Sequence, residues 1–471
     1  MAHLWKPRPH SVLPRAVAFL FALRWVDSSV GLAGCGGVFS DGVSSVIGRS
    51  VNRARPNFQS NTADYSAGSS PIKLFPMEYP LQNLRVLDLA RVLAGPYAGR
   101  MLSDLGADVV KIEPPDGDVT RLWGAVINGI PGYFNFTNAG KRNMCIDLRN
   151  PDGVSVLKQL VAQADILVEN YRPGVMARLG LSYEELSAIN PKLIMLSISG
   201  FGQNGPESQR PAYAPVLHAE SGLLARQLAF AGRSDVDADV GMSVADTNAA
   251  LHGLIGLLAA LHMRSTTGVG QHVDIAMIDS MMGTDDYLHY VLEDAEDTAP
   301  LRSRIWNTAG GPMLITGDFR FIWKGLHERC GVADPTPAGA DLEQKIAARL
   351  QAAEQFFAHG CRDRDEVIGV LNKLNLAWGD ARDAATLPES PTVRHRQSIA
   401  QVDDRGGGTR PVAQSPYRFS SARSGIRGGT AHKGEHNAAV LEDWLDLDSA
   451  SLQRMLSSAA LHSEITQETE G

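Results

Sequence analysis

From residue 86 onward, short apolar runs alternate with segments whose apolar residues recur at helical spacing. Residues 86–89 predict a buried strand, Pro96 stands where a helix can begin, and the apolar stripe of that helix ends at Gly106. A second apolar run at 108–113 completes a strand–helix–strand unit, and the pattern recurs through residue 199. This alternation predicts an α/β fold with a Rossmann-like, doubly wound parallel sheet.

The pattern changes after residue 300. A long apolar helix over 247–264 precedes the change, and the segment that follows it carries amphipathic helical patterns with few strand patterns. Residues 406–430 are rich in Gly, Arg and Ser, which is typical of a long connection, and helical patterns then return. We therefore predict a large Rossmann-like domain over 78–300, a smaller α+β domain over 301–405, and a returning linker with C-terminal helices over 406–471.

Residues 1–77 differ from this body in charge. They contain eight Lys and Arg residues and three Asp residues, so this segment carries +5 and the other 394 residues carry −13 of the net −8. A basic, Ser-containing leader is typical of an organelle transit peptide. A secretion signal is disfavoured because the apolar run at 16–23 is only eight residues long, and Arg24 and Asp27 separate it from Cys35. A leader without folded structure, or a start placed too early, is the third alternative. We expect a cytoplasmic protein, or a mitochondrial one if the leader is a transit peptide.

The composition excludes several classes of protein. A chain of 471 residues with 44% hydrophobic and 20% charged residues is typical of a globular protein of two or three domains. The acidic pI of about 5.9 disfavours nucleic acid as a partner. The four cysteines lie too far apart for a CxxC metal site, and no metal is expected. No apolar run approaches 18 residues, so no segment is expected to cross a membrane and no membrane partner is expected.

Asp246 is the candidate catalytic residue, because it stands at the head of the most apolar helical pattern in the chain. From the residues alone an N-cap is the favoured interpretation, although helix-terminal N–H groups also suit a nucleophilic carboxylate. Glu169 and Asn170 follow a predicted buried strand, where either a ligand contact or a capped strand end fits.

Two weaker signals have alternative explanations. Residues 200–205 match GxGxxG, but Pro206 and Pro211 follow in place of a helix, so a loop is predicted and not a dinucleotide site. Basic residues such as Lys141 and Arg178 suit phosphate binding, yet isolated basic side chains are more often solvated.

Several motifs, in this order and spacing, resemble the family III CoA-transferases, also called the CaiB/BaiF family. The matching segments are residues 86–96, 106–113, 138–142, 164–174, 199–206, and Asp246 with 268–274. The resemblance weakens over 300–405 and resumes at 415–416 and 434–436.

The resemblance implies a function. Asp246 matches the family's nucleophile, which attacks an acyl-CoA thioester and carries first the acyl group and then CoA, before an acceptor acid takes the CoA. The substrates implied are acyl-CoA and small carboxylic acids, with no permanently bound cofactor, and the assembly implied is an interlocked homodimer. Positions that match CoA contacts in the family are Arg91, Val92, Leu93, Ala94, Lys141, Asn170, Tyr171, Arg178 and Leu179.

Two other functions stay open at this point. The related α-methylacyl-CoA racemases use a His where Tyr213 stands here, which argues against racemase or epimerase chemistry. A CoA-binding protein without catalysis is the second alternative, and the presence of Asp246 argues against it. Residues 307–312 match the glycine-rich substrate loop of oxalate-type transferases only in part, so the donor and acceptor acids are left open.

Overall fold

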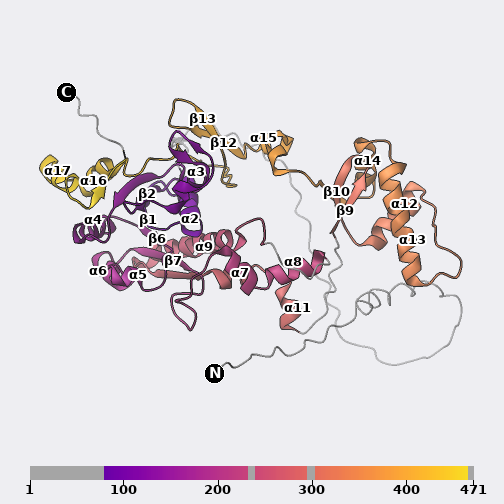
Figure 1. Cartoon of the computed structure of the whole chain (residues 1–471), viewed down its shortest axis with the longest axis horizontal. Coiled ribbons are helices and arrows are strands. Elements are labelled where there is room, and N and C mark those ends of the chain that lie inside the picture. The colour runs from indigo at the N-terminus through magenta and orange to yellow at the C-terminus, as the bar shows by residue number, and fades with distance from the viewer. Residues whose placement is uncertain (1–78, 232–238, 294–302, 465–471) are drawn as a thin grey trace, which may run out of the picture. The chain divides into compact units, whose positions relative to one another are not determined.

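The computed structural model describes residues 79–231, 239–293 and 303–464 (Figure 1). The predicted leader, residues 1–77, lies outside these ranges. The described residues group into two compact units, one with the segments before residue 298 and after residue 381, the other between them. Residues 382–405, which were predicted in the small domain, group with the larger unit.

The larger unit is built on a seven-stranded sheet with the order β14-β5-β2-β1-β6-β7-β8. Every neighbouring pair in it is parallel except β14 with β5. The strands are β1 (Arg85–Asp88), β2 (Asp108–Glu113), β5 (Arg142–Ile146), β6 (Ile166–Glu169), β7 (Ile194–Ser199), β8 (His272–Ala276) and β14 (Leu461–His462). The chain winds outward from β1 through β2 and β5, then returns to lay β6 against the other side of β1. The predicted doubly wound α/β fold is confirmed.

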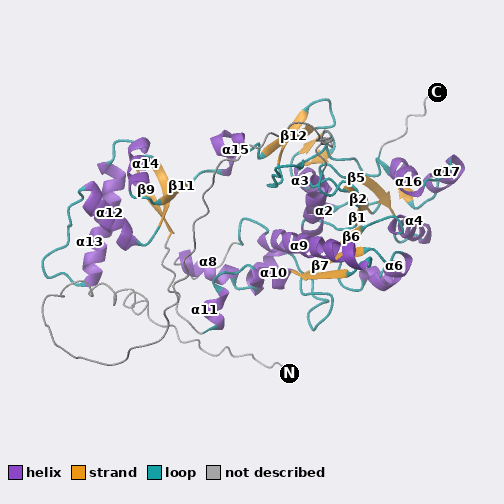
Figure 2. Ribbon diagram, turned by 180° about the vertical axis from the view of Figure 1, so that it is seen from behind, coloured by secondary structure: helices purple, strands orange, loops and turns teal. Residues whose placement is uncertain are grey.

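Helices cover both faces of this sheet because alternate residues of each strand point to opposite sides. Val86 and Ile166 pack with α2 (Ala94–Asp104), α7 (Ala214–Glu220) and α9 (Val244–Thr267). Leu87 and Leu167 pack on the other side, with α4 (Pro151–Val161), α6 (Tyr183–Ile189) and α16 (Asn437–Leu445). Figure 2 shows α16 and α4 side by side at one end of the sheet.

Helix α9 is longer than the sequence predicted, because it spans Val244–Thr267. With 24 residues and a mean hydropathy of 1.4 it is long and apolar enough to cross a membrane by length and composition, so the expectation that no segment is long enough is wrong. Ala residues between the larger apolar ones sustain this average. One face of α9 is packed in the core, where Gly253 lets the helix approach Leu196 of β7 closely.

Shorter elements complete the larger unit. Gly406–Gly408 close a β-hairpin between β12 (Ile399–Asp403) and β13 (Thr409–Ala413), so the predicted long connection is in part a hairpin. The buried Arg100 of α2 anchors β13 by donating to the Ala413 carbonyl at 2.6 Å. The remaining elements are η1 (Val119–Leu122), β3 (Val126–Ile127), β4 (Ile130–Pro131), α3 (Gly132–Asn138), α5 (Val175–Arg178), α8 (Leu223–Ala231), α10 (Met277–Gly283), α11 (Leu288–Leu292), η3 (Ala384–Glu389), α15 (Pro391–His395) and α17 (Ser449–Leu456).

The smaller unit has its own core. Its antiparallel sheet has the order β11-β10-β9 and consists of β9 (Ser303–Thr308), β10 (Gly311–Thr316) and β11 (Ala377–Asp380). Its helices are α12 (Phe319–Cys330), α13 (Leu342–Gln355), η2 (Phe356–Gly360) and α14 (Arg364–Lys373). Trp306, Met313 and Phe357 are buried between the two layers. The partial match to a glycine-rich substrate loop, residues 307–312, is the tight turn of the β9–β10 hairpin.

Candidate active site

The sheet reverses its winding between β1 and β6, and ligands of doubly wound sheets bind beside such a switch point. The loop after β1 and the loop after β6 meet there. The Asn170 side chain accepts the Arg91 N–H at 2.7 Å and donates to the Arg91 carbonyl at 2.8 Å. Residues predicted from two distant motifs are therefore joined in one place by the fold.

Asp246 lies in the first turn of α9, which begins at Val244. The predicted N-cap role is wrong, because Ser243 occupies the cap position and Asp246 is the third residue of the helix. A carboxylate in the first turn still faces the positive end of the helix dipole. The carboxylate of Asp246 therefore benefits from the helix N-terminus but does not cap the helix.

Two further helix N-termini converge on Asp246. The backbone N–H groups of Ala94, the first residue of α2, and Ala214, the first residue of α7, are directed at the carboxylate. Burial raises the Asp246 pKa to about 6, while His218 and these N–H groups lower it. The carboxylate is therefore ionised at neutral pH but poorly solvated, which favours nucleophilic attack.

His218 is a residue that the sequence did not assign to the site. It is fully buried on α7, and its Nε2 accepts the N–H of Ala245 at 3.2 Å. Its Nδ1 therefore carries the hydrogen and donates to Asp239 at 2.9 Å. His218 satisfies an N–H of the first turn of α9 directly beside Asp246, so it serves the capping function that was predicted for Asp246.

Tyr133 on α3 is a second residue that the sequence missed. Burial raises its pKa, and the negative charges of Asp246 and Asp118 raise it further. Its ring meets Trp123 edge to face, with centroids 5.2 Å apart. An aromatic pair therefore includes one ring whose hydroxyl senses the charge of Asp246.

The residues predicted to contact CoA lie in different loops and differ in how far they are exposed. Arg91, Leu93 and Ala94 line the loop after β1, and Arg91 Nε is buried without a hydrogen-bond partner among the described residues. Tyr171 follows Asn170, and burial raises its pKa to about 12, against the lowering effect of the Arg91 charge. Two more of the predicted residues lie at the end of α5: Arg178 is exposed and Leu179 is partly buried.

Lys141 does not fit the prediction of a CoA contact. Its side chain is fully buried, and its ammonium group donates to Asp88 at 2.7 Å, to the Pro96 carbonyl at 2.7 Å and to Asn138 at 2.9 Å. All three N–H bonds are used inside the protein, which argues against contact with a phosphate.

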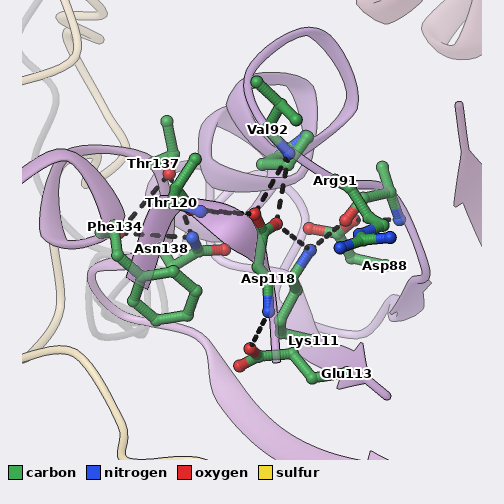
Figure 3. A network of polar contacts seen from close by, with 12 residues as sticks. Asp88, Arg91, Val92, Lys111, Glu113, Asp118, Thr120, Phe134, Thr137 and Asn138 are labelled. Atoms are coloured by element: carbon green, nitrogen blue, oxygen red, sulfur yellow. Dashed lines mark hydrogen bonds and ion pairs between the residues drawn. The ribbon is translucent and has the colours of Figure 1, made fainter. Parts of the chain in front are cut away.

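Lys141 belongs to a group of four buried ionic side chains, here called the paired cluster, whose other members are Asp88, Lys111 and Asp118. Asp118 accepts the N–H of Val92 at 3.1 Å, as Figure 3 shows. Val92 has a φ of 68°, a conformation that costs a β-branched residue about 1–3 kcal/mol. The loop that carries Ala94 is thus held under backbone strain by this cluster.

The other polar candidates have structural partners. Glu169 accepts the Tyr171 N–H at 2.8 Å, and burial raises its pKa to about 7 against a hydrogen bond from Ser197. The glycine motif at 200–205 is a loop with no helix before Ala214, as predicted. Within the described ranges, no group of three or more His, Cys, Asp or Glu side chains is arranged to hold a metal.

These features are typical of one class of protein, an α/β enzyme with a poorly solvated carboxylate beside the switch point of a doubly wound sheet. Comparison with known proteins then identifies the family. The model of CoA-transferase family III matches residues 81–437, and the chain belongs to this family. The predicted family and the prediction of a CoA-transferase enzyme are confirmed.

Three similar proteins match this chain over nearly their whole length. Succinate–glutarate CoA-transferase of Agrobacterium fabrum is 41% identical over 77% of this chain and 95% of its own. Succinyl-CoA–D-citramalate CoA-transferase of Chloroflexus aurantiacus is 32% identical over 79% and 97%. The crystal structure of a CaiB/BaiF family protein from Brucella suis matches with a TM-score of 0.66 and 30% identity over 78% of this chain and 100% of that one.

Proposed function

We propose that Asp246 is the nucleophile through which this enzyme moves CoA from an acyl-CoA to a carboxylic acid. The observation that supports it is the carboxylate itself, which is partly buried among three helix N-termini and, among the described residues, forms no ion pair with Lys or Arg. Such a group is reactive, and the N–H groups of Ala94 and Ala214 are available to stabilise the oxyanion that forms beside it.

The proposed reaction has four steps. An Asp246 oxygen attacks the thioester carbonyl carbon and the C–S bond breaks. This step releases CoA thiolate and forms a mixed anhydride between Asp246 and the donor acyl group. The thiolate then attacks the Asp246 carbonyl carbon, which releases the donor acid and forms an aspartyl-CoA thioester. The acceptor carboxylate attacks that carbon and expels the thiolate, and the thiolate finally attacks the acceptor's acyl carbon, which frees Asp246.

CoA is proposed to bind along residues 91–94, with Asn170, Tyr171, Arg178 and Leu179 beside it. The guanidinium of Arg91, with one buried N–H left unpaired within the described chain, supports a contact with an anionic group of CoA. Because the two curated relatives compared above are named for succinate, glutarate and citramalate, we infer that the acids exchanged here are short dicarboxylates.

We further propose that the enzyme acts as an interlocked homodimer. The support is the second face of α9, where Leu251, Ile255, Leu258 and Met263 are exposed, with Ile255 at 64%. A contiguous apolar stripe on a helix is expected to be covered by another surface. Ile255→Glu should shift the mass measured by light scattering from that of a dimer to that of a monomer, and an unchanged mass would argue against this face.

The test of the nucleophile uses the full-length protein with succinyl-CoA and hydroxylamine. Hydroxylamine should convert the aspartyl thioester to a hydroxamate on the peptide that contains Asp246, detected by mass spectrometry. Asp246→Ala should lose transfer by at least about 10⁴-fold and show no such adduct. Asp279→Asn is the matched control, because Asp279 is also the third residue of its helix but is exposed. Full transfer by Asp246→Ala, or proton exchange at the α-carbon without transfer, would contradict the proposal.

A further inference from the structure

The loop between β1 and α2 has a backbone that its own sequence does not favour. Val92 is the only β-branched residue with a φ in the left-handed region among the described residues. Val92 is followed by Leu93, which is buried at the N-cap of α2, and then by Ala94, whose N–H faces Asp246. The direction of that N–H therefore depends on the conformation of Val92.

Side chains from two strands and two loops hold this backbone. Asp88 accepts the Ala90 N–H at 3.0 Å, Lys111 donates to the Ala90 carbonyl, and Asn170 bonds both polar groups of Arg91. Asp118 accepts the Val92 N–H. Five consecutive backbone polar groups are thus bonded to side chains, where a strained turn would otherwise relax. Figure 3 shows the bond between Asp118 and Val92 among them.

Asp118 is the member of this group that acts on Val92 itself, and it is rigidly placed. Its carboxylate accepts the backbone N–H and the hydroxyl of Thr120, both at 3.0 Å, and lies 3.5 Å from the Lys111 ammonium. Its own N–H donates to Glu113 at 2.8 Å. Because Lys111 and Glu113 belong to β2, the position of Asp118 is fixed by the sheet.

We propose that Asp118, anchored by Lys111, is a positioning residue that keeps Val92 in the left-handed conformation and thereby aims the Ala94 N–H at the Asp246 carboxylate. The inference rests on the proposed role of Asp246. It assigns the orientation of one oxyanion-stabilising donor, the Ala94 N–H, to a buried ion pair that holds the backbone two residues before Ala94.

The experiment is a double-mutant cycle in the full-length enzyme. Asp118→Asn should lower kcat by about 10- to 100-fold, since a misdirected donor loses much of its effect. Glycine adopts a positive φ without strain and alanine does not. Asp118→Asn should therefore lower kcat by less than about threefold in a Val92→Gly background. In a Val92→Ala background it should lower kcat by the full 10- to 100-fold, about as much as in the wild type.

A second measurement separates positioning from simple support of the fold. Losing the Ala94 N–H should raise the pKa of Asp246, so the midpoint of the pH–activity profile should move upward in Asp118→Asn and return in the Val92→Gly background. If Asp118→Asn does not fold, Thr120→Val, which removes only the hydroxyl bond to Asp118, should show the same shift to a smaller degree.

Three results would overturn the inference: unchanged kcat in Asp118→Asn, an equal loss in the glycine and alanine backgrounds, or a loss with no shift of the midpoint. These outcomes are distinct from failure of the proposed nucleophile. If Asp246→Ala is inactive while Asp118→Asn is fully active, only the positioning role is wrong. If Asp246→Ala is active, the proposed function is wrong.

Discussion

The paired cluster lies beside the switch point, as do the surroundings of Asp246, here called the pocket, which consist of the Ala94 and Ala214 N–H groups and His218. The loop 88–94 connects the two regions, and both hold carboxylates largely away from solvent, but they stabilise charge differently. In the cluster, burial raises the Asp118 pKa, yet the charge of Lys111 and bonds from Thr120 and Val92 bring it below its usual value. In the pocket, backbone N–H groups and a histidine only partly offset burial, and the Asp246 pKa stays raised. A cation makes a buried carboxylate inert and useful as scaffold, whereas helix N-termini alone leave it reactive.

The largest effect on stability should come from breaking a pair in the cluster. Lys141→Met leaves the Asp88 carboxylate buried without its cation and should lower the free energy of unfolding by about 3–5 kcal/mol, measured by urea denaturation. The double variant Lys141→Met with Asp88→Asn should recover part of that loss, because no lone charge remains. If Lys141→Met is as stable as the wild type, the contrast between the two regions is wrong.

The opposite sign is expected in the pocket. The folded pKa of Asp246, about 6, lies above its ordinary value of 3.8, so the ionised carboxylate destabilises the fold at higher pH. Asp246→Asn should therefore raise the free energy of unfolding by about 3 kcal/mol above pH 6, and the gain should vanish as the pH falls to 4. A gain independent of pH would mean that the charge is not its cause.

The pH dependence of catalysis should follow the ionisation of Asp246 and not that of the carboxylates in the paired cluster. Because Asp246 must be ionised to attack, kcat/KM should rise about tenfold per pH unit up to a midpoint near pH 6 and then level off. Asp118 of the cluster, whose pKa is lowered, should stay ionised across this range. Initial rates of CoA transfer from about pH 5 to about pH 8 measure this, and a flat profile would contradict it.

The smallest effect should be seen on Tyr133, which is near a carboxylate of each region. Removing the Asp246 charge by Asp246→Asn should lower the Tyr133 pKa, because that charge contributes to raising it. NMR titration of ring-labelled tyrosine can follow it, with Tyr133→Phe to assign the signal. No change would mean that Asp246 carries no charge in the folded protein or is screened from this ring.

The sequence predicted those features that depend on side-chain pattern. The apolar runs of β1, β2, β6 and β7 follow from burial on both faces of a parallel sheet, and Asp246 was found because a carboxylate stands out at the head of an apolar helix. The short strand β14 was missed and predicted as helix, because two residues paired at a sheet edge carry no period.

The sequence predicted only part of the site. The N–H groups of Ala94 and Ala214 have no sequence signal, since every residue except proline carries one. The positive φ of Val92 contradicts the preference of valine, so only tertiary contacts reveal it. Lys141 was misjudged because a lysine's three donors are identified as satisfied only when Asp88, Pro96 and Asn138 are brought together by the fold.

The pairing of β14 with β5 has a consequence for how the protein is made. Leu461 lies opposite Ile146, so the strand that closes this sheet edge is synthesised about 315 residues after the strand it covers. At roughly 5–20 residues per second, the β5 edge stays open on the ribosome for about 15 to 60 seconds. An open edge is a template for pairing with other chains, so nascent or C-terminally shortened chains should depend on chaperones more than the finished enzyme does.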